Sequence, residues 1–309
     1  MEFNHKSVLL KEAIDSLGIN PNGIYVDGTA GGAGHSLEIA KRLKSGKLFA
    51  LDRDPDAVAV ATDKLKGYNA TVIESNFDNM REALEKYGVF SVDGVLLDLG
   101  VSSYQLDNAS RGFSYKQDAP LDMRMGKSGT TAADIVNTYS ANELIRIFRD
   151  YGEERFAVKI ANRIVSERQC EPIVSTVRLC DIIASCVPSA IRREGNPARK
   201  CFQALRIEVN GELDSLNKVL DVAFDMLNAG GVLSVITFHS LEDRVVKSKF
   251  KELCTGCTCP PDFPMCVCGK KPRGELLNRK PILPSEEEIN ENQRSRSAKL
   301  RSVRKIREG

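Results

Sequence analysis

The sequence predicts an α/β fold in which a doubly wound parallel sheet is interrupted by an all-helical insertion. Short apolar runs alternate with segments of helical spacing between residues 24 and 98. Residues 107–200 carry helical patterns and no strand pattern, and the alternation resumes over residues 202–253. Strands that alternate with helices at this spacing are typical of parallel sheets.

The expected strands of the first part are short and apolar, as buried parallel strands usually are. They lie at residues 24–26, 47–51, 70–73 and 92–97, with helices at 7–17, 36–43, 56–65 and 79–87. The insertion is expected to hold helices at 132–136, 141–151, 156–167 and 174–187. A long helix over 202–227, a cap at Gly230-Gly231, a strand over 232–238 and a helix to about 253 then follow.

We therefore expect two domains. Residues 1–106 and 201–309 form one discontinuous domain, and residues 107–200 form a helical substrate-recognition insertion. The discontinuous domain includes a cysteine-rich loop at 254–268 and a basic tail at 294–309. The tail is either an arm that binds RNA or a further strand over 298–306 at an edge of the sheet.

Composition places the chain among soluble globular proteins, with 42% hydrophobic and 28% charged residues. No apolar run reaches the roughly 18 residues that a transmembrane helix needs. Residues 1–11 lack the apolar core of a signal peptide. Nine cysteines without an export signal indicate reduced thiols or metal ligands rather than disulfides. These features predict a cytoplasmic protein that does not enter membranes.

The net charge is only +2, but it is unevenly distributed. Residues 270–309 carry 12 basic and 6 acidic side chains, so this part holds +6 and the remainder about −4. Within the insertion, basic residues are densest from Arg192 to Lys200. Such segments suit contact with a phosphate backbone, although solvated charged faces have the same composition.

A glycine-rich segment follows the first predicted strand, from Asp27 to Gly34. Glycine lets a backbone approach a ligand closely, and the helix after Gly34 directs free N–H groups into the same space. The dinucleotide fingerprint G-x-G-x-x-G is not met, because position 37 is leucine. The pattern resembles instead a variant of the S-adenosylmethionine loop of Rossmann-like methyltransferases.

Informative side chains stand at the ends of the next predicted strands, where α/β sheets bind ligands. Asp52 ends the second strand and could accept hydrogen bonds from both ribose hydroxyls, while Asp54 is better placed to cap the next helix. Phe77 follows the third strand, where an aromatic ring either stacks on adenine or packs in the core. Asp98 ends the fourth strand, beside the expected reactive centre.

Several longer motifs together resemble the RsmH (MraW) family. These are GTAGGAGHS (28–36), DRDP (52–55), LDLGVSS (97–103), RGFS (111–114), DMRM (122–125), YGEER (151–155), FQALR (202–206) and FHSLEDR (238–244). The resemblance implies a Rossmann-like class I methyltransferase fold and S-adenosylmethionine-dependent methylation of a cytidine N4 in bacterial small-subunit ribosomal RNA. It also implies an assembled or nearly assembled subunit as substrate; a homodimer is left open.

The same resemblance implies which residues bind the cofactor. They are Ala33, Gly34, His35, Asp52, Phe77, Asp98 and Gln105. Several of these positions agree with the strand-end interpretation.

The chemistry requires an acceptor near the cytosine amine, whose lone pair is delocalised into the ring. A carboxylate that accepts its N–H favours a localised lone pair and later takes the proton. Asp98, or a carbonyl in its turn, is the candidate. His239 is a second catalytic candidate that either relays a proton, contacts RNA or caps a helix. Tyr104 or Phe238 would stack on the base or pack in the core.

Five cysteines fall within 15 residues, at positions 254, 257, 259, 266 and 268. Four thiolates can hold a structural zinc ion, and we expect Cys254, Cys257, Cys266 and Cys268 in that role. The spacing is not a standard pair of C-x₂-C motifs, so a reduced, metal-free loop is the alternative.

Two other functions compete with RNA methylation. One is a non-catalytic RNA-binding ribosome assembly factor that keeps the cofactor fold, and the other is a methyltransferase of proteins or small molecules. The acids at Asp52 and Asp98 argue against the first, and the basic tail and insertion argue against the second.

Overall fold

The computed structural model describes residues 7–193, 195–257, 259, 265 and 268–306. The chain forms two compact units. The sheet unit comprises residues 1–100 and 213–309, and the helical unit comprises residues 101–212, which contain the predicted insertion. No helix in the described ranges has both the length and the apolar character needed to cross a membrane.

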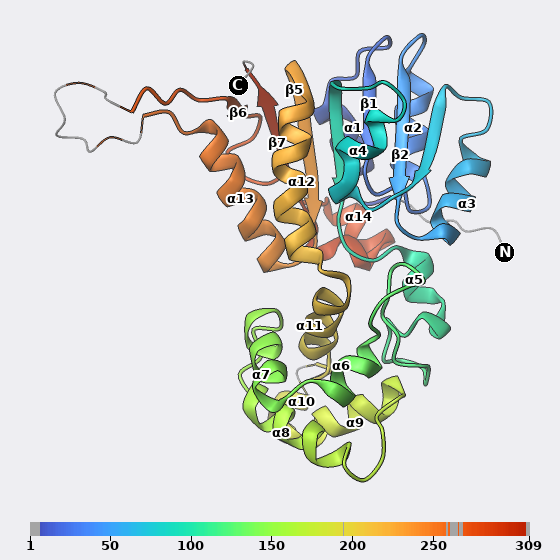
Figure 1. Ribbon diagram of the computed structural model, residues 1–309, viewed down its shortest axis with the longest axis vertical. Coiled ribbons are helices and arrows are strands. Elements are labelled where there is room, and N and C mark those ends of the chain that lie inside the picture. Colours follow the sequence, from blue (N-terminus) through green and yellow to red (C-terminus); the bar gives the residue numbers. More distant parts are fainter. Residues whose placement is uncertain (1–6, 194, 258, 260–264, 266–267, 307–309) are drawn as a thin grey trace. The chain divides into compact units, whose positions relative to one another are not determined.

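A seven-stranded sheet forms the centre of the sheet unit, with the order β3-β2-β1-β4-β5-β7-β6 (Figure 1). Neighbours from β3 to β5 pair in parallel, whereas β7 is antiparallel to both β5 and β6. The strands are β1 (Ile24–Asp27), β2 (Lys47–Asp52), β3 (Ala70–Glu74), β4 (Val92–Asp98), β5 (Leu227–Thr237), β6 (Gly274–Leu276) and β7 (Lys299–Lys305). The predicted α/β fold with a parallel sheet is confirmed.

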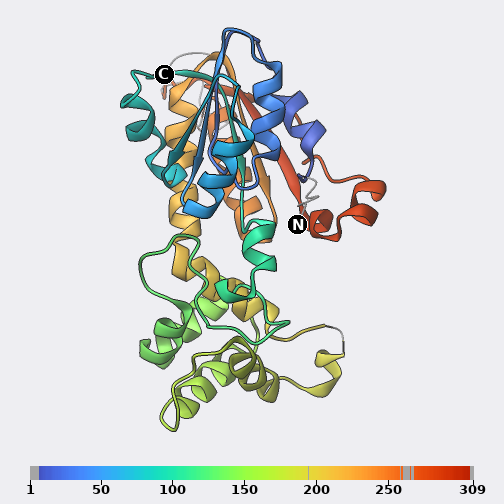
Figure 2. The ribbon, with the colours of Figure 1, turned by 90° about the vertical axis from the view of Figure 1, so that its right-hand side faces the viewer.

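Helices pack on both faces of this sheet, so its strands are apolar on both sides (Figures 1 and 2). Leu97 and Val235 belong to one buried cluster and Leu96 and Ile236 to another, because successive side chains point to opposite faces. The first cluster includes residues of α4 (Met80–Glu85), α12 (Glu212–Met226) and α13 (Ser240–Cys254); the second includes residues of α1 (Leu10–Leu17), α2 (Gly34–Arg42) and α3 (Pro55–Lys64).

The parallel register brings the carboxyl ends of β1, β2 and β4 to one edge of the sheet. Asp27 pairs with Ala50 of β2 and with Leu96 of β4. Residues that follow these strands therefore meet at a common edge, which is where open α/β sheets bind ligands.

Much of the basic tail is part of the sheet. Strand β7 lies between β5 and β6, so the strand expected over 298–306 exists but is not at an edge. The edge strand next to β7 is β6, which has no expected counterpart. Helix α14 (Glu286–Glu291) and two 3₁₀ turns, η1 (Phe77–Asn79) and η3 (Gln293–Ser297), complete the described elements of this unit.

The helical unit has its own apolar core, built from residues between Phe113 and Leu205. Capping boxes begin three of its described helices, formed by Ser102 and Gln105, by Thr131 and Asp134, and by Ser140 and Glu143. Its elements are α5 (Ser103–Asp107), η2 (Ala109–Arg111), α6 (Ala132–Thr138), α7 (Ala141–Asp150), α8 (Ala157–Glu167), α9 (Thr176–Cys186), α10 (Ser189–Arg192) and α11 (Arg199–Asn210).

Two expected boundaries are wrong. The long helix over 202–227 is divided into α11 and α12 at Gly211, whose φ of 58° is left-handed. Glycine reaches this conformation without the Cβ clash that other residues meet, so it ends α11. The pair Gly230-Gly231 lies within β5 instead of capping a helix, and β5 begins at Leu227.

Candidate active site

The glycine-rich turn after β1 is held by backbone hydrogen bonds to two neighbouring strands. Gly28 N donates to Leu96 O of β4 (2.9 Å), and Ala30 N donates to Leu51 O of β2 (2.8 Å). Helix α2 then begins at Gly34, after Ala33 in the left-handed conformation (φ 59°), without a side-chain cap. Its first turn therefore presents N–H groups and the positive end of the helix dipole.

Two glycines of this turn are required by packing. A Cβ on Gly28 would lie 2.5 Å from Leu97 Cδ2 and 3.3 Å from Phe77 Cβ. A Cβ on Gly34 would lie 1.9 Å from Ser7 Oγ, so this glycine admits the segment that precedes α1. Around Gly32, by contrast, nothing lies within 4 Å.

Asp27 fastens the turn to α2, a role that sequence reasoning missed. This carboxylate is buried, accepts from Thr29 N (3.1 Å) and accepts from the hydroxyl of Ser36 (2.6 Å). A buried ion needs such partners. An acid immediately before the glycine-rich turn was the available signal.

Asp52 lies at the end of β2, and both of its carboxylate oxygens are oriented by backbone donors. Oδ2 accepts from Gly31 N and Oδ1 from Asp54 N, each at 2.8 Å. Burial raises its pKa from 3.8 to about 6, against the effect of these two hydrogen bonds. Asp54 caps α3 by accepting from Asp56 N, so the helix cap and the candidate ribose acceptor are different residues.

Asp98 lies at the end of β4, within the same edge of the sheet. Its backbone N donates to Thr29 Oγ1 (2.6 Å), which ties it to the turn. Oδ1 is buried and has no hydrogen-bond partner among the described atoms. Burial, followed by the charges of Asp27 and Glu242, raises the pKa of Asp98 well above its ordinary value.

His35 is buried beside Asp98, with Nδ1 3.6 Å from Asp98 Oδ2. Its Nε2 lies 3.0 Å from the carbonyl of Val8, which can only accept, so Nε2 carries the hydrogen. In a neutral ring Nδ1 is then an acceptor that faces a carboxylate. A proton on Nδ1 would make the ring a cation that faces this carboxylate and pairs with Oδ2.

Phe77 and Phe238 lie beside these acids. Phe77 is half-buried, packs against the cluster that contains Leu97, and lies next to Gly28. Phe238 follows β5 and lies next to Gly100, in the turn after Asp98; a Cβ there would be 3.6 Å from the ring. Both aromatic rings border the carboxyl edge of the sheet.

The remaining predicted residues have local partners. His239 is the N-cap of α13, where Nδ1 accepts from Glu242 N at 3.4 Å and Nε2 lies 3.1 Å from Glu242 Oε1. Gln105 belongs to the helical unit, where Oε1 accepts from Ser102 N in the capping box of α5. The exposed Tyr104 is in the same helix.

The sequence pattern of the MraW methylase family matches residues 2–306. The chain belongs to the MraW methylase family. It is 55% identical to "Ribosomal RNA small subunit methyltransferase H" of Lachnospira eligens over 311 residues, covering 99% of both chains. It is 53% identical to the protein of that name from Clostridioides difficile over 311 residues, covering 99% of this chain and 100% of the relative.

Solved structures also align with this MraW-family chain along most of its length. A putative rRNA methylase from Clostridium thermocellum aligns with a TM-score of 0.45 at 13% identity, covering 98% of this chain and all of the other. A putative methyltransferase from Streptococcus mutans, solved in complex with SAH, aligns with a TM-score of 0.46 at 13% identity, covering 97% and 99%.

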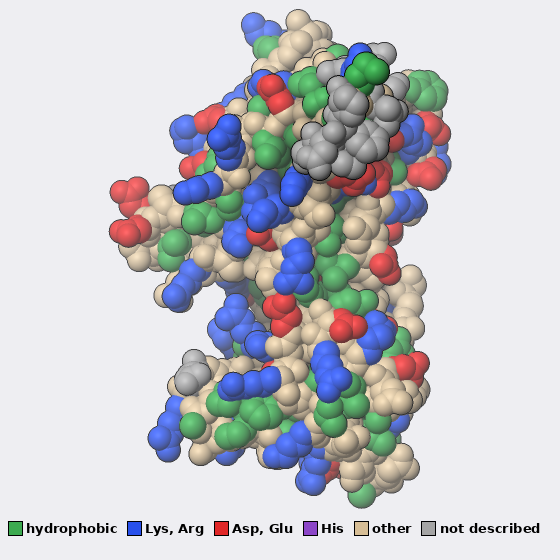
Figure 3. Space-filling model, turned by 90° about the vertical axis from the view of Figure 1, so that its left-hand side faces the viewer, with side chains coloured by type: hydrophobic (Ala, Val, Ile, Leu, Met, Phe, Trp, Pro, Cys, Tyr) green, Lys and Arg blue, Asp and Glu red, His purple; other side chains and the backbone are tan. Residues whose placement is uncertain are grey.

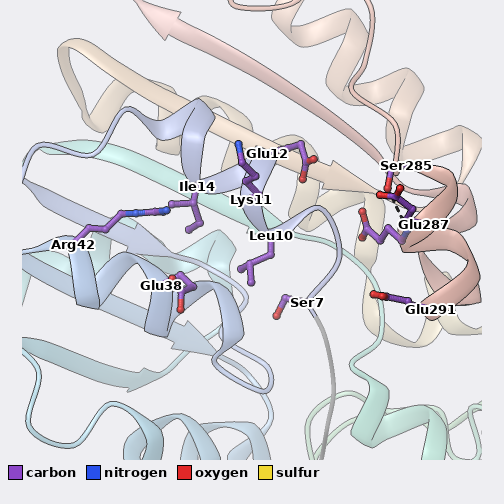
Figure 4. Close-up of a pocket in the computed structure, with 11 residues that line it drawn as sticks. Ser7, Leu10, Lys11, Glu12, Ile14, Glu38, Arg42, Ser285, Glu287 and Glu291 are labelled. Atoms are coloured by element: carbon purple, nitrogen blue, oxygen red, sulfur yellow. Dashed lines mark hydrogen bonds between the residues drawn. The ribbon is translucent and has the colours of Figure 1, made fainter.

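A separate cavity of about 380 Å³ lies among α1, α2 and α14 (Figure 4). It is lined by Ser7, Leu10, Lys11, Glu12, Ile14, Glu38, Arg42, Ser285, Glu287, Glu288 and Glu291. None of the predicted cofactor residues lines it. Five carboxylates against two basic side chains also make it unsuited to a phosphate backbone.

The described cysteines that lie close together are not the same set that was predicted to bind a metal ion. The thiols of Cys257, Cys259 and Cys268 lie within 4.8 Å of one another, and Cys254 is not among them. Cys254 packs against the apolar core of the sheet unit, and burial raises the pKa of its thiol. Cys266 lies outside the described residues.

Basic side chains of the tail are largely engaged in the sheet unit. Arg301 and Lys299 bind Asp243 at 2.7 and 3.2 Å. Lys305 is buried, and its Nζ donates to the carbonyls of Asp225 and Leu227. These contacts favour a structural role for β7 over an arm that binds RNA.

Proposed function

We propose that this MraW-family methylase transfers a methyl group from S-adenosylmethionine to the N4 of one cytidine in small-subunit ribosomal RNA. Its membership of a methylase family supports the reaction class. The shared name of its relatives supports ribosomal RNA as the substrate. The observation that carries the proposed chemistry is the buried Oδ1 of Asp98 beside the glycine-rich turn, which has no hydrogen-bond partner among the described residues.

The residues at the sheet edge fit this cofactor. Asp52 has lone pairs beyond those used by Gly31 N and Asp54 N, and it is oriented to accept from ribose hydroxyls. Ala33, Gly34 and His35 form the start of α2, whose N–H groups suit the carboxylate of the methionine part. Phe77 forms the adenine wall. S-adenosylmethionine, when bound, supplies an electrophilic methyl group on a sulfonium.

Asp98 performs the acid–base work. Its Oδ1 accepts an N–H of the cytosine amine, which localises the lone pair of the attacking nitrogen. The proton that leaves the amine then passes to this carboxylate, whose raised pKa makes it a stronger acceptor than an ordinary aspartate. His35 holds Oδ2 from the other side, so Oδ1 stays directed at the substrate.

His239 has a positioning role in this proposal. Glu242 Oε2 accepts from the backbone N–H groups of Phe238 and His239, at 2.8 and 3.2 Å. This capping box fixes the turn that carries Phe238. Phe238 stacks on the target base.

RNA contact beyond the base is assigned to the helical unit. Arg192, Arg193 and Arg199 are exposed there, close to one another in the sequence. On the face drawn in Figure 3, Lys and Arg side chains are spread among acidic ones over both units. We propose an assembled or nearly assembled subunit as the substrate, and hence the cytoplasm as the location.

We further propose a structural zinc ion in the cysteine-rich segment, away from the reaction.

Light scattering of the purified protein tests for the homodimer that the sequence leaves open.

Incubation with labelled S-adenosylmethionine and small subunits from a strain lacking the enzyme tests the proposed activity. Label in the ribosomal RNA of these subunits supports it, with subunits from a strain that has the enzyme as the unlabelled control. Label in protein identifies a protein methyltransferase, and binding of subunits without any label identifies an assembly factor; either result overturns the proposal.

A further inference from the structure

The described part of the cysteine-rich segment places three thiols together. Cys268 Sγ lies 3.7 Å from Cys257 Sγ, and the sulfur of Cys259 is within 4.8 Å of both. The backbone N of Cys259 donates to Cys257 Sγ at 3.4 Å. An N–H donor of this kind stabilises a thiolate more than a thiol.

The sulfur separations indicate a shared metal ion. A disulfide requires about 2.05 Å between its sulfurs, far less than the 3.7 Å between Cys257 and Cys268. In a tetrahedral site with Zn–S bonds of about 2.3 Å, two sulfurs lie about 3.8 Å apart. The observed separation matches that edge of the tetrahedron. As a thiol, Cys268 can donate to Cys257 at this distance, whereas three thiolates this close repel one another unless a cation lies between them.

Packing does not account for the short distances between these three thiols. Cys257 and Cys268 are exposed and Cys259 is half-exposed, so none of the three is enclosed by an apolar core of the described residues. The segment leaves α13 at Cys254 and returns at Arg273, whose N donates to Leu253 O at 2.9 Å. Ordering a loop of this length costs conformational entropy, which a metal crosslink offsets.

We infer that Cys257, Cys259 and Cys268 bind one Zn²⁺ as thiolates, and that this ion fastens the loop between α13 and β6. This ligand set rests on the proposed zinc function and does not depend on methyl transfer. Three Zn–S bonds form, and the thiol protons are released to solvent. A water molecule or other donor takes the fourth position. Soft thiolate ligands select zinc over magnesium or calcium.

The geometry also excludes Cys254 from the ligands. Its thiol is half-buried against the core at the end of α13, where desolvation disfavours the thiolate. Cys254→Ser is therefore the matched control for Cys257→Ser and Cys268→Ser, since all three remove one thiol from the same segment.

The test measures zinc in full-length protein purified under reducing conditions without added metal. We expect about one equivalent in the wild type and in Cys254→Ser, and less than about a tenth in Cys257→Ser and Cys268→Ser. Circular dichroism establishes that each variant is folded. Cobalt substitution supplies a second readout, because thiolate ligation gives sulfur-to-metal charge-transfer bands in the wild type that the two ligand variants lose.

Each outcome decides between the possibilities. Wild-type protein without zinc and without a cobalt–thiolate band overturns metal binding altogether. Zinc retained in Cys257→Ser, or lost in Cys254→Ser, overturns this ligand set while leaving the zinc proposal in place.

Discussion

Replacing Asp52 by asparagine should have opposite effects on the stability of the protein without cofactor and on its affinity for the cofactor. The carboxylate of Asp52 is poorly solvated in the empty fold, and its pKa is about 6 instead of 3.8. The folded state therefore holds a proton more tightly than the unfolded state does. Stability falls as the pH rises through the interval from 3.8 to about 6, and the full cost is present above it.

The magnitude follows from this shift of pKa. At about 1.4 kcal/mol for each unit, the ionised Asp52 costs about 3 kcal/mol of folding free energy at neutral pH. Asparagine has a similar shape and does not titrate. It still accepts one of the hydrogen bonds from Gly31 N and Asp54 N, and losing the other costs about 1 kcal/mol at every pH.

Urea denaturation of both proteins without cofactor, at about pH 4 and about pH 8, isolates the titration. Between these values the wild type loses about 2–3 kcal/mol relative to Asp52→Asn, because the constant hydrogen-bond loss cancels in the difference. Calorimetry with S-adenosylhomocysteine gives the opposite ranking for binding, with Asp52→Asn about 10- to 100-fold weaker. Parallel pH profiles for the two proteins would refute the raised pKa of Asp52.

Two further predictions concern packing and ion pairing in the sheet unit. Gly28→Ala places a Cβ 2.5 Å from Leu97 Cδ2 and should cost about 1–3 kcal/mol in urea denaturation, whereas Gly32→Ala, with open space around it, should stay within about 0.5 kcal/mol. Equal effects of the two alanines would contradict this packing. Burial opposes ionisation of Asp243, but hydrogen bonds from its basic partners outweigh it and lower its pKa. Arg301→Ala should therefore cost about 2–3 kcal/mol at neutral pH. The difference should shrink as the pH falls below 3.8 and through the lower pKa at which Asp243 takes up its proton in the folded protein. No loss of stability would show that this ion pair is dispensable.

The positions at the ends of the strands were predictable, because parallel strands direct their carboxyl ends to one edge. Asp52 and Asp98 each follow a short apolar run, and the structure brings both to that edge beside the glycine-rich turn. The separation of Asp54 as a helix cap was also predictable, since it directly precedes a proline at the start of α3.

Contacts between distant segments were not predictable from local patterns. The bond from Ser36 to Asp27 depends on the exact path of the turn between them. Cys254 and Cys257 are close in sequence, yet the first is half-buried at the helix end and the second is exposed in the loop. A single glycine inside a helical pattern is often tolerated, so the sequence around Gly211 does not mark a helix end. Only the left-handed backbone of Gly211 shows that it ends α11.

The central claim is that Asp98 accepts a proton from a cytidine amine during methyl transfer. The most direct test digests small-subunit RNA after incubation with S-adenosylmethionine and either the wild type or Asp98→Asn, and identifies methylated nucleosides by mass spectrometry. We predict N4-methylcytidine with the wild type and a rate about 10²- to 10⁴-fold lower with Asp98→Asn, which still binds S-adenosylhomocysteine. A different methylated nucleoside, or an undiminished rate in the variant, would contradict the account.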